Sequence, residues 1–114
     1  MTLTNKQQKW LDKAPNFDDD MMERLQNPEF EAGWLELTLQ EFLEDGDFNT
    51  FIRCLTYVVK ARGRGEISRL AKASSIDRSN LSEILNGKVT PRIDTAIKLI
   101  RGLGYECDIK LKTA

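Results

Sequence analysis

Apolar residues recur along most of the chain with the three- and four-residue spacing of amphipathic helices. Between Phe48 and Val59 they follow the i, i+3, i+4, i+7 rhythm, and Asp47 stands where an N-cap is expected. Asp18 is a similar cap candidate, and Gly46 and Gly104 are candidate helix stops. The pattern predicts an all-α fold of five to six helices, over about 18–27, 29–45, 48–62, 66–74, 78–86 and 92–103.

The helix over 29–45 has two apolar stripes instead of the one that a surface helix shows. One consists of Phe30, Trp34 and Leu37, and the other, on roughly the opposite side, of Leu35, Leu39, Phe42 and Leu43. Two stripes imply contacts on two sides. Either the helix packs on its own core and on a second protein, or it is enclosed within its own domain.

The helix over 92–103 is expected to bury one face, made of Ile93, Ala96, Ile97, Ile100 and Leu103. Beyond it the period changes, because apolar and charged residues alternate strictly over 105–112. A period of two predicts a half-buried strand, which needs a second strand to satisfy its backbone groups. The only local candidate, near Thr2–Thr4, is weak. We therefore expect pairing with a second copy of the chain or with a partner protein.

Charge divides the chain into two halves of opposite sign. Residues 1–50 hold twelve acids and four bases, a net charge of −8, and residues 51–114 hold thirteen bases and six acids, a net charge of +7. The basic half suits nucleic acid and the acidic half a basic protein, although the halves could also pair with each other. The expected regions are an arm over 1–16, an acidic helical region over 17–46 and a DNA-binding region over 47–114.

The stretch from Glu66 to Lys88, within a unit of roughly residues 64–90, predicts two short helices that cross around a tight turn. Ala71 is small enough for the crossing, and Asp77 can cap the second helix. Inward positions are apolar, at Ile67, Leu70, Ile76, Leu81, Ile84 and Leu85. Short or hydrogen-bonding residues that fit a major groove then face outward, namely Arg78, Ser79, Ser82 and Glu83. The alternative is a helical hairpin that binds no DNA.

This spacing resembles the helix-turn-helix of the Cro/C1 (XRE-type) repressors, and the Asn86-Gly87-Lys88 tail matches the loop that follows their recognition helix. The family usually has glycine in the turn where this chain has Ser75. The resemblance implies base reading by the second helix and phosphate contacts by its neighbours. The candidate DNA-binding residues are Arg78, Ser79, Asn80, Ser82, Glu83, Lys72, Asn86 and Lys88.

Over residues 16–111 the chain is also similar to the HigA-like addiction-module antidotes. The matching pieces are Phe17-Asp18, the helix end Leu43–Asp47, the helix Phe51–Arg62, Ser68–Lys72 and Leu99–Tyr105. The resemblance implies an antitoxin that neutralises a small basic mRNA-cleaving toxin of the RelE/HigB-like kind and represses its own operon as a dimer. A stand-alone phage-type repressor without a toxin is the alternative.

The partners implied are operator DNA, the toxin and a second copy of the chain, joined through the strand over 105–112. The candidate toxin-binding residues lie on the helix over 29–45, at Trp34, Leu35, Leu39 and Phe42.

No enzyme is expected, since the chain has no His and no Ser or Cys in a recognisable nucleophile setting. The three acids Asp18–Asp20 could seed a metal site, but successive residues at a helix start face different directions. Neither a metal nor a cofactor is therefore expected. Cys54 lies beside the apolar face of its helix and is expected to be a core thiol. With no apolar run of membrane-spanning length and no signal-peptide pattern, a cytoplasmic location is expected.

Overall fold

The computed structural model describes residues 17–113, and within that range the chain is all-helical. It has six helices there and no strand. The expectation of an all-α fold is therefore confirmed, and most helix bounds lie within two residues of those predicted. The helices are α2 (Phe17–Arg24), α3 (Pro28–Asp45), α4 (Phe48–Arg62), α5 (Glu66–Ser74), α6 (Arg78–Leu85) and α7 (Ile93–Gly102).

Side-chain caps explain where the long helices begin. The Asn27 side chain accepts from the Glu29 backbone N–H at 2.9 Å, and Pro28 follows it as the first residue of α3. Asp47 caps α4 as predicted, because its carboxylate accepts from the backbone N–H and the hydroxyl of Thr50. These bonds lower the pKa of Asp47. Asp18 is not a cap, because α2 already begins at Phe17 and Asp18 lies within its first turn.

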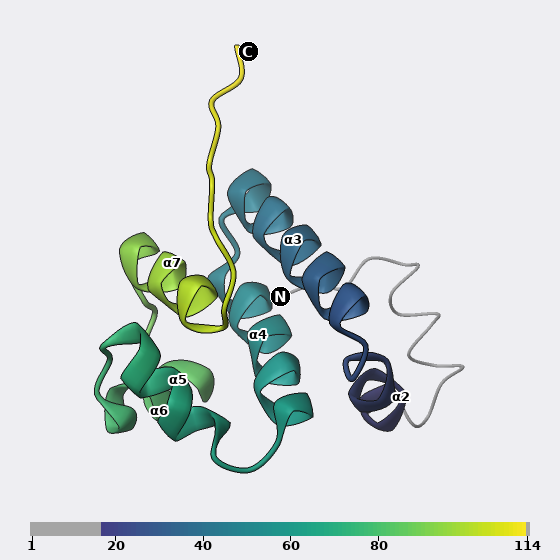
Figure 1. Ribbon diagram of the computed structural model, residues 1–114. Coiled ribbons are helices and arrows are strands. Elements are labelled where there is room, and N and C mark those ends of the chain that lie inside the picture. The colour runs from purple at the N-terminus through teal and green to yellow at the C-terminus, as the bar shows by residue number, and fades with distance from the viewer. Residues whose placement is uncertain (1–16, 114) are drawn as a thin grey trace. The chain divides into compact units, whose positions relative to one another are not determined.

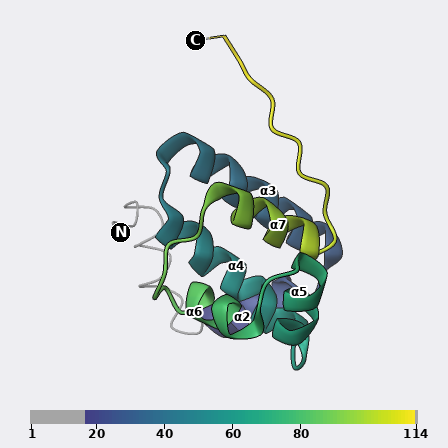
Figure 2. The same ribbon diagram turned by 90° about the vertical axis from the view of Figure 1, so that its left-hand side faces the viewer.

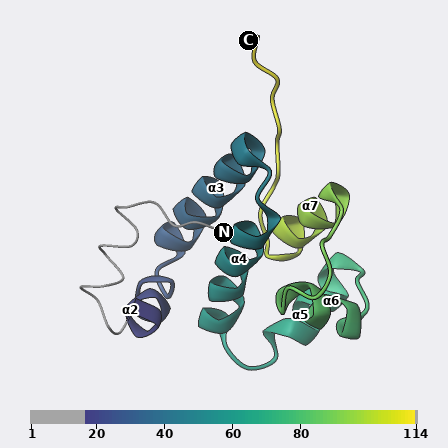
Figure 3. The ribbon, with the colours of Figure 1, turned by 180° about the vertical axis from the view of Figure 1, so that it is seen from behind.

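The described residues form two compact units that divide after Glu66. Unit 1 holds α2, α3 and α4, and α4 packs against both of the others (Figures 1 and 3). Its core contains a tight group of rings, since the Phe42 centroid lies 4.3 Å from that of Phe48 and 5.1 Å from that of Phe51. Further buried side chains come from all three helices, including Met21, Leu35, Leu55 and Val58. Helix α4, which we expected to belong with residues 47–114, is thus part of unit 1.

Unit 2 holds α6, α7 and all of α5 after Glu66, gathered around a small core (Figure 2). Leu70, Leu81 and Leu99 are almost completely buried in it. The buried face of α7 differs from our expectation, because Ile93 is 51% exposed whereas Leu99, which we had not placed there, is fully buried. The reason is that the face is centred on Ala96, Leu99 and Leu103, so that Ile93 in the first turn lies at its edge.

The strand predicted over 105–112 is not seen. Residues 105–113 leave the end of α7 as an extended trace without regular structure (Figures 1 and 2). Strand geometry requires a hydrogen-bonded neighbour, and the described chain contains no second strand. The alternation persists only near α7, where Tyr105 and Cys107 are half-buried, while Leu111 is 98% exposed. The candidate partner near Thr2–Thr4 lies outside the described residues.

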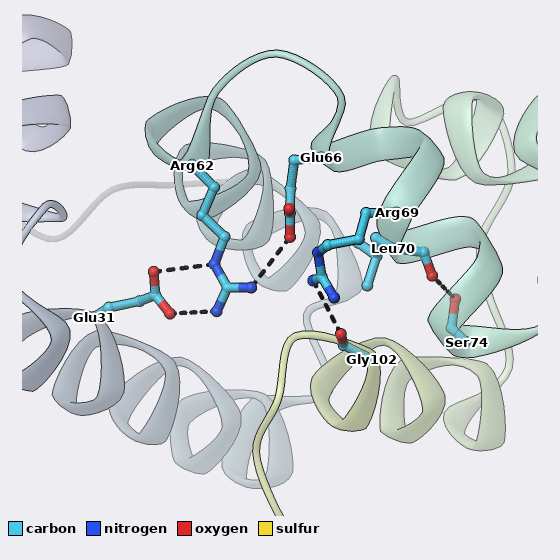
Figure 4. Close-up of polar contacts among 7 residues, drawn as sticks. All are labelled: Glu31, Arg62, Glu66, Arg69, Leu70, Ser74 and Gly102. Carbon is cyan, nitrogen blue, oxygen red and sulfur yellow. Dashed lines mark hydrogen bonds and ion pairs between the residues drawn. The ribbon is translucent and has the colours of Figure 1, made fainter.

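A buried group of three charges holds unit 1 together (Figure 4). Arg62, near the end of α4, binds both carboxylate oxygens of Glu31 on α3, at 2.5 and 3.2 Å. Its remaining terminal nitrogen donates to Glu66, the first residue of α5, at 3.1 Å. Both carboxylate side chains are less than 10% exposed. Hydrogen bonding to Glu31 raises the pKa of Arg62 even further above its ordinary value, so the guanidinium stays charged.

Replacing this guanidinium should destabilise the protein strongly. Arg62→Met keeps most of the apolar stem but removes the guanidinium that binds the buried carboxylates of Glu31 and Glu66, and we expect unit 1 to lose about 3 kcal/mol of stability. Urea unfolding followed by circular dichroism measures the loss. The matched control is Arg24→Met, because Arg24 pairs with Asp20 at 2.9 Å on the surface. It should cost less than about 1 kcal/mol.

The double variant Arg62→Met with Glu31→Gln separates a charge effect from a packing effect. If the buried charge of Glu31 causes the destabilisation, adding Glu31→Gln to Arg62→Met should recover part of the lost stability. Equal stability of the Arg62→Met and Arg24→Met variants would contradict a structural role for the buried group.

Candidate functional site

The turn between α5 and α6 is closed by backbone hydrogen bonds that end α5. The Ile76 N–H donates to the Ala71 carbonyl at 3.0 Å, and the Ser75 N–H donates to the Lys72 carbonyl at 3.3 Å. This pair of bonds is a Schellman motif, which requires a left-handed residue at its centre. Ser75 has that conformation, with φ of 56°. Ser75 thus adopts the left-handed conformation for which this motif usually has glycine.

Helix α6 is held at both ends. The Asp77 side chain accepts from the Ser79 N–H at 3.2 Å, which confirms the predicted cap. At the other end Gly87, with φ of 74°, closes a second Schellman motif in which the Lys88 N–H donates to the Glu83 carbonyl at 2.9 Å. This reversal of the backbone places Lys88 directly beyond the last turn of α6, next to the residues that α6 exposes.

The predicted DNA-binding residues all lie on the surface of unit 2. Ser82 is half-buried and the other seven are exposed: Lys72, Arg78, Ser79, Asn80, Glu83, Asn86 and Lys88. In the part of the chain that the structure describes, no salt bridge is recorded for Lys72, Arg78 or Lys88. The inward residues Leu81 and Ile84 are buried. Helix α6 thus presents a polar face flanked by cations that have no counter-ion within the described part of the chain, and DNA contact by these residues stays a prediction.

Behind this face, α5 and α7 approach each other closely at Gly102 (Figure 4). A Cβ added to Gly102 would lie 2.8 Å from the Leu70 Cδ1 and 3.2 Å from the Ser74 Cβ. The Arg69 guanidinium donates to the Gly102 carbonyl at 3.1 Å, and the Ser74 hydroxyl donates to the Leu70 carbonyl. We predicted Ala71 as the small residue where α5 and α6 cross, and it is indeed buried, but we did not predict the contact of α5 with α7 at Gly102. The sequence signal was a glycine within an apolar run at a helix end.

The predicted toxin-binding residues of α3 do not share one surface. Leu35 and Phe42 are buried in the core of unit 1 and, as folded here, present almost no surface. Trp34 and Leu39 are half-buried. Of the two stripes, the one containing Leu35 and Phe42 faces the core and the other lies at its edge. A toxin interface on α3 stays a prediction, and the burial of Leu35 and Phe42 disfavours their part in it.

A series of partly exposed rings extends across the three helices of unit 1. The Tyr57 ring lies edge-on to Phe17 at 5.7 Å and to Trp34 at 6.3 Å between centroids, and Trp34 stacks with Phe30 at 6.4 Å. All four are half-buried. The Trp34 indole N–H donates to the Cys54 carbonyl at 3.1 Å, and the Tyr57 hydroxyl donates to Asp18 at 2.7 Å. Burial and then the bond to Asp18 raise the pKa of Tyr57 from 10.0 to about 12.

Unit 1, which carries these rings, is acidic. Residues 17–66 contain twelve acids and five bases, a net charge of −7, whereas residues 67–113 contain nine bases and five acids, a net charge of +4. Helix α3 has six acids and no base. Glu31 is neutralised by Arg62, but no salt bridge is recorded for Glu36, Glu41 or Glu44 among the described residues. The two units therefore carry net charges of opposite sign, as the two halves of the sequence do.

Other candidate sites are weak. Cys54 is half-buried, and burial raises the pKa of its thiol, so it stays protonated. Within residues 17–113 no group of three His, Cys, Asp or Glu side chains is arranged to hold a metal ion. None of the helices described has the length and apolar composition needed to cross a membrane.

Comparison with known proteins identifies a family for the chain. A family model described as "probable addiction module antidote protein" matches residues 16–111. No curated protein and no solved structure matches the chain significantly. The family match covers both units, so it applies to the acidic ring-bearing surface and to the polar face of α6 alike.

The strained turn residue yields a stability prediction. A side chain in the left-handed region costs about 1 kcal/mol, and glycine removes this cost while adding about 0.5 kcal/mol of unfolded-chain entropy. Ser75→Gly should therefore stabilise unit 2 by about 0.5 kcal/mol, measured by urea unfolding. Ser68→Gly, at an exposed position within α5, should lower stability by about the same amount. A loss of stability in both variants would show that Ser75 is not strained.

Proposed function

Because the chain belongs to the family of probable addiction-module antidote proteins, it is the antitoxin of such a module, and we propose that it neutralises a basic mRNA-cleaving toxin and represses its own operon. The toxin would be a small RelE/HigB-like protein, as the similarity to HigA-like antidotes implies. The operon would be bound through a Cro/C1-type helix-turn-helix formed by α5 and α6. The observation that carries the proposal is the family match over residues 16–111.

The proposal for the toxin is supported by charge. An enzyme that cleaves mRNA must bind a polyanion, and a basic protein surface is the usual means of doing so. Unit 1 offers the complementary surface, with a net charge of −7 over residues 17–66. Opposite charge of this size accelerates association and favours the correct partner over others. The antitoxin would then act by binding alone, without catalysing a reaction.

The proposal for DNA is supported by the exposed face of α6. An α-helix fits the major groove, where side chains read the base edges while neighbouring cations hold the phosphates. Here Arg78, Ser79 and Glu83 project from α6, and Lys72 and Lys88 lie at the ends of the neighbouring segments with no counter-ion among residues 17–113. The net charge of +4 over residues 67–113 favours the same partner.

Repression by a single short helix would be weak, and we propose a two-fold dimer. The two copies of α6 would then lie about 34 Å apart, one turn of DNA. The segment 105–112 would form its strand only on pairing with the second copy. This pairing would cover Ile109 and Leu111, which are 42% and 98% exposed in the single chain. Exposed apolar residues in alternation with charges suit such an edge-to-edge contact.

Neutralisation can be tested in cells. The small protein encoded by the adjoining reading frame, expressed alone from an inducible promoter, should stop growth. Co-expression of this chain should restore growth, and the two proteins should elute together on size exclusion. Growth arrest that this chain does not relieve would contradict the proposed toxin, and a harmless adjoining protein would place the toxin elsewhere.

Measurements of DNA binding can distinguish a residue that contacts bases from one that contacts phosphates. Arg78→Ala should reduce the preference for the upstream operon DNA over scrambled DNA roughly tenfold, because it removes a base contact. Lys88→Ala should weaken binding to both DNAs and flatten the salt dependence, because it removes a phosphate contact. Fluorescence anisotropy at two salt concentrations measures both effects.

The matched control for the DNA experiment is Lys98→Ala, which removes an exposed cation of unit 2 on α7, outside the proposed interface. It should leave both affinities nearly unchanged. If all three variants lose affinity equally on both DNAs, the assignment of α6 as the reading helix is wrong and the binding is due to net charge alone.

A further inference from the structure

The rings on the edge of unit 1 form a continuous surface, which we name the ring row: Phe17, Tyr57, Trp34, Phe30 and Leu37. Leu37 belongs to it because it follows Phe30 and Trp34 on α3 at the helical i, i+4, i+7 spacing. Leu37 is 53% exposed and the four rings are half-buried. The ring row therefore draws on α2, α3 and α4 and leaves apolar area open to solvent on one flank of α3.

The polar atoms of the ring row are already satisfied within unit 1. Trp34 donates its indole N–H to the Cys54 carbonyl, and Tyr57 donates its hydroxyl to Asp18. A partner could therefore cover the rings without leaving either polar atom unpaired, because neither atom needs water as its hydrogen-bond partner. The rings are also held rigid by contact with one another, with 5.7–6.4 Å between neighbouring centroids. Rigid aromatic side chains are the residues that most often dominate protein interfaces.

Carboxylates border the ring row. Asp18 contacts Tyr57 directly, and Glu41 follows Leu37 by one helical turn on α3. No salt bridge is recorded for these two acids among residues 17–113. Aromatic faces next to unpaired carboxylates suit Lys and Arg side chains, which can lie on a ring while their charge meets an acid.

We propose that the ring row is the surface that binds the toxin, and that the toxin covers it with a segment bearing Lys or Arg side chains. This inference rests on the proposed function, which supplies a basic partner for the acidic unit. It departs from our first set of candidate residues, because it keeps Trp34 but replaces the buried Leu35 and Phe42 with Leu37 and the rings of α2 and α4.

Helix α3 provides a matched pair of variants. Leu37 and Leu43 are both exposed leucines on α3, at 53% and 44%, but they lie on different flanks of the helix. The same-face neighbours of Leu43 are Leu39 and Glu36, and no ring lies among them. Leu37→Arg and Leu43→Arg therefore introduce the same charge on the same helix. Both residues are exposed, so both variants should fold, which far-ultraviolet circular dichroism checks.

The probe is the toxin of the adjoining reading frame, separated from the co-expressed pair by denaturation and refolded. Titration calorimetry should give a dissociation constant raised at least tenfold by Leu37→Arg and changed less than about threefold by Leu43→Arg. In a second measurement the antitoxin is labelled with 5-fluorotryptophan, and Trp10→Phe assigns the two fluorine resonances. The toxin should shift the Trp34 resonance of the labelled antitoxin.

Each result has a distinct meaning. Failure of the unaltered antitoxin to bind the toxin would overturn the proposed partner itself. Normal binding by the unaltered chain with equal effects of the two arginine variants would overturn the ring row alone, as would an unmoved Trp34 resonance. Sedimentation of the unbound antitoxin tests the remaining alternative, in which a second copy of the chain covers the ring row. If Leu37→Arg turns a dimer into a monomer, the ring row binds that second copy and the inference is wrong.

Discussion

The buried ion group of Arg62 with Glu31 and Glu66 is the constraint on which unit 1 depends. Helices α2, α3 and α4 offer a small apolar core, and a core of that size stabilises a fold by only a few kcal/mol. Arg62 ties α3 to α4 through two bonds to Glu31 and fixes the first residue of α5 through Glu66. Because both carboxylates are buried, removing the Arg62 cation is expected to destabilise the group strongly.

A second constraint acts in unit 2, where backbone bonds rather than side chains set the direction of the polypeptide. Helices α5, α6 and α7 each end in a Schellman motif, centred on Ser75, Gly87 and Gly104. Ser75 is the one non-glycine residue with positive φ in the part of the chain described. The close approach at Gly102 then sets α5 against α7. The turns at Ser75 and Gly87 therefore fix how the backbone enters and leaves α6.

The helices could be predicted from the sequence because their signals are local. Asp47, Gly46 and Asp77 cap or end helices through bonds to residues at most four positions away. What failed depended on distant contacts. Neither the pairing of Arg62 with Glu31, 31 residues apart, nor the contact at Gly102 leaves a periodic trace in the sequence. The two stripes of α3 were visible, but periodicity does not tell which one is buried. Likewise, the alternation over 105–112 predicts a strand, but the described residues contain no second strand with which it could pair.

The contrast between paired and unpaired charges connects the fold to the proposed function. In unit 1 the acids that face inward are matched by Arg62, whereas acids such as Glu36, Glu41 and Glu44 face solvent with no recorded salt bridge. A net charge of −7 over residues 17–66 destabilises a small compact unit through self-repulsion. Folding therefore gains nothing from these acids, while binding to a basic partner would relieve the repulsion. In unit 2 the unpaired cations around α6 present the same situation with the opposite sign, and a polyanion would relieve it. On this argument each unit is most stable when bound, as expected if the protein holds a toxin and a stretch of DNA as we propose.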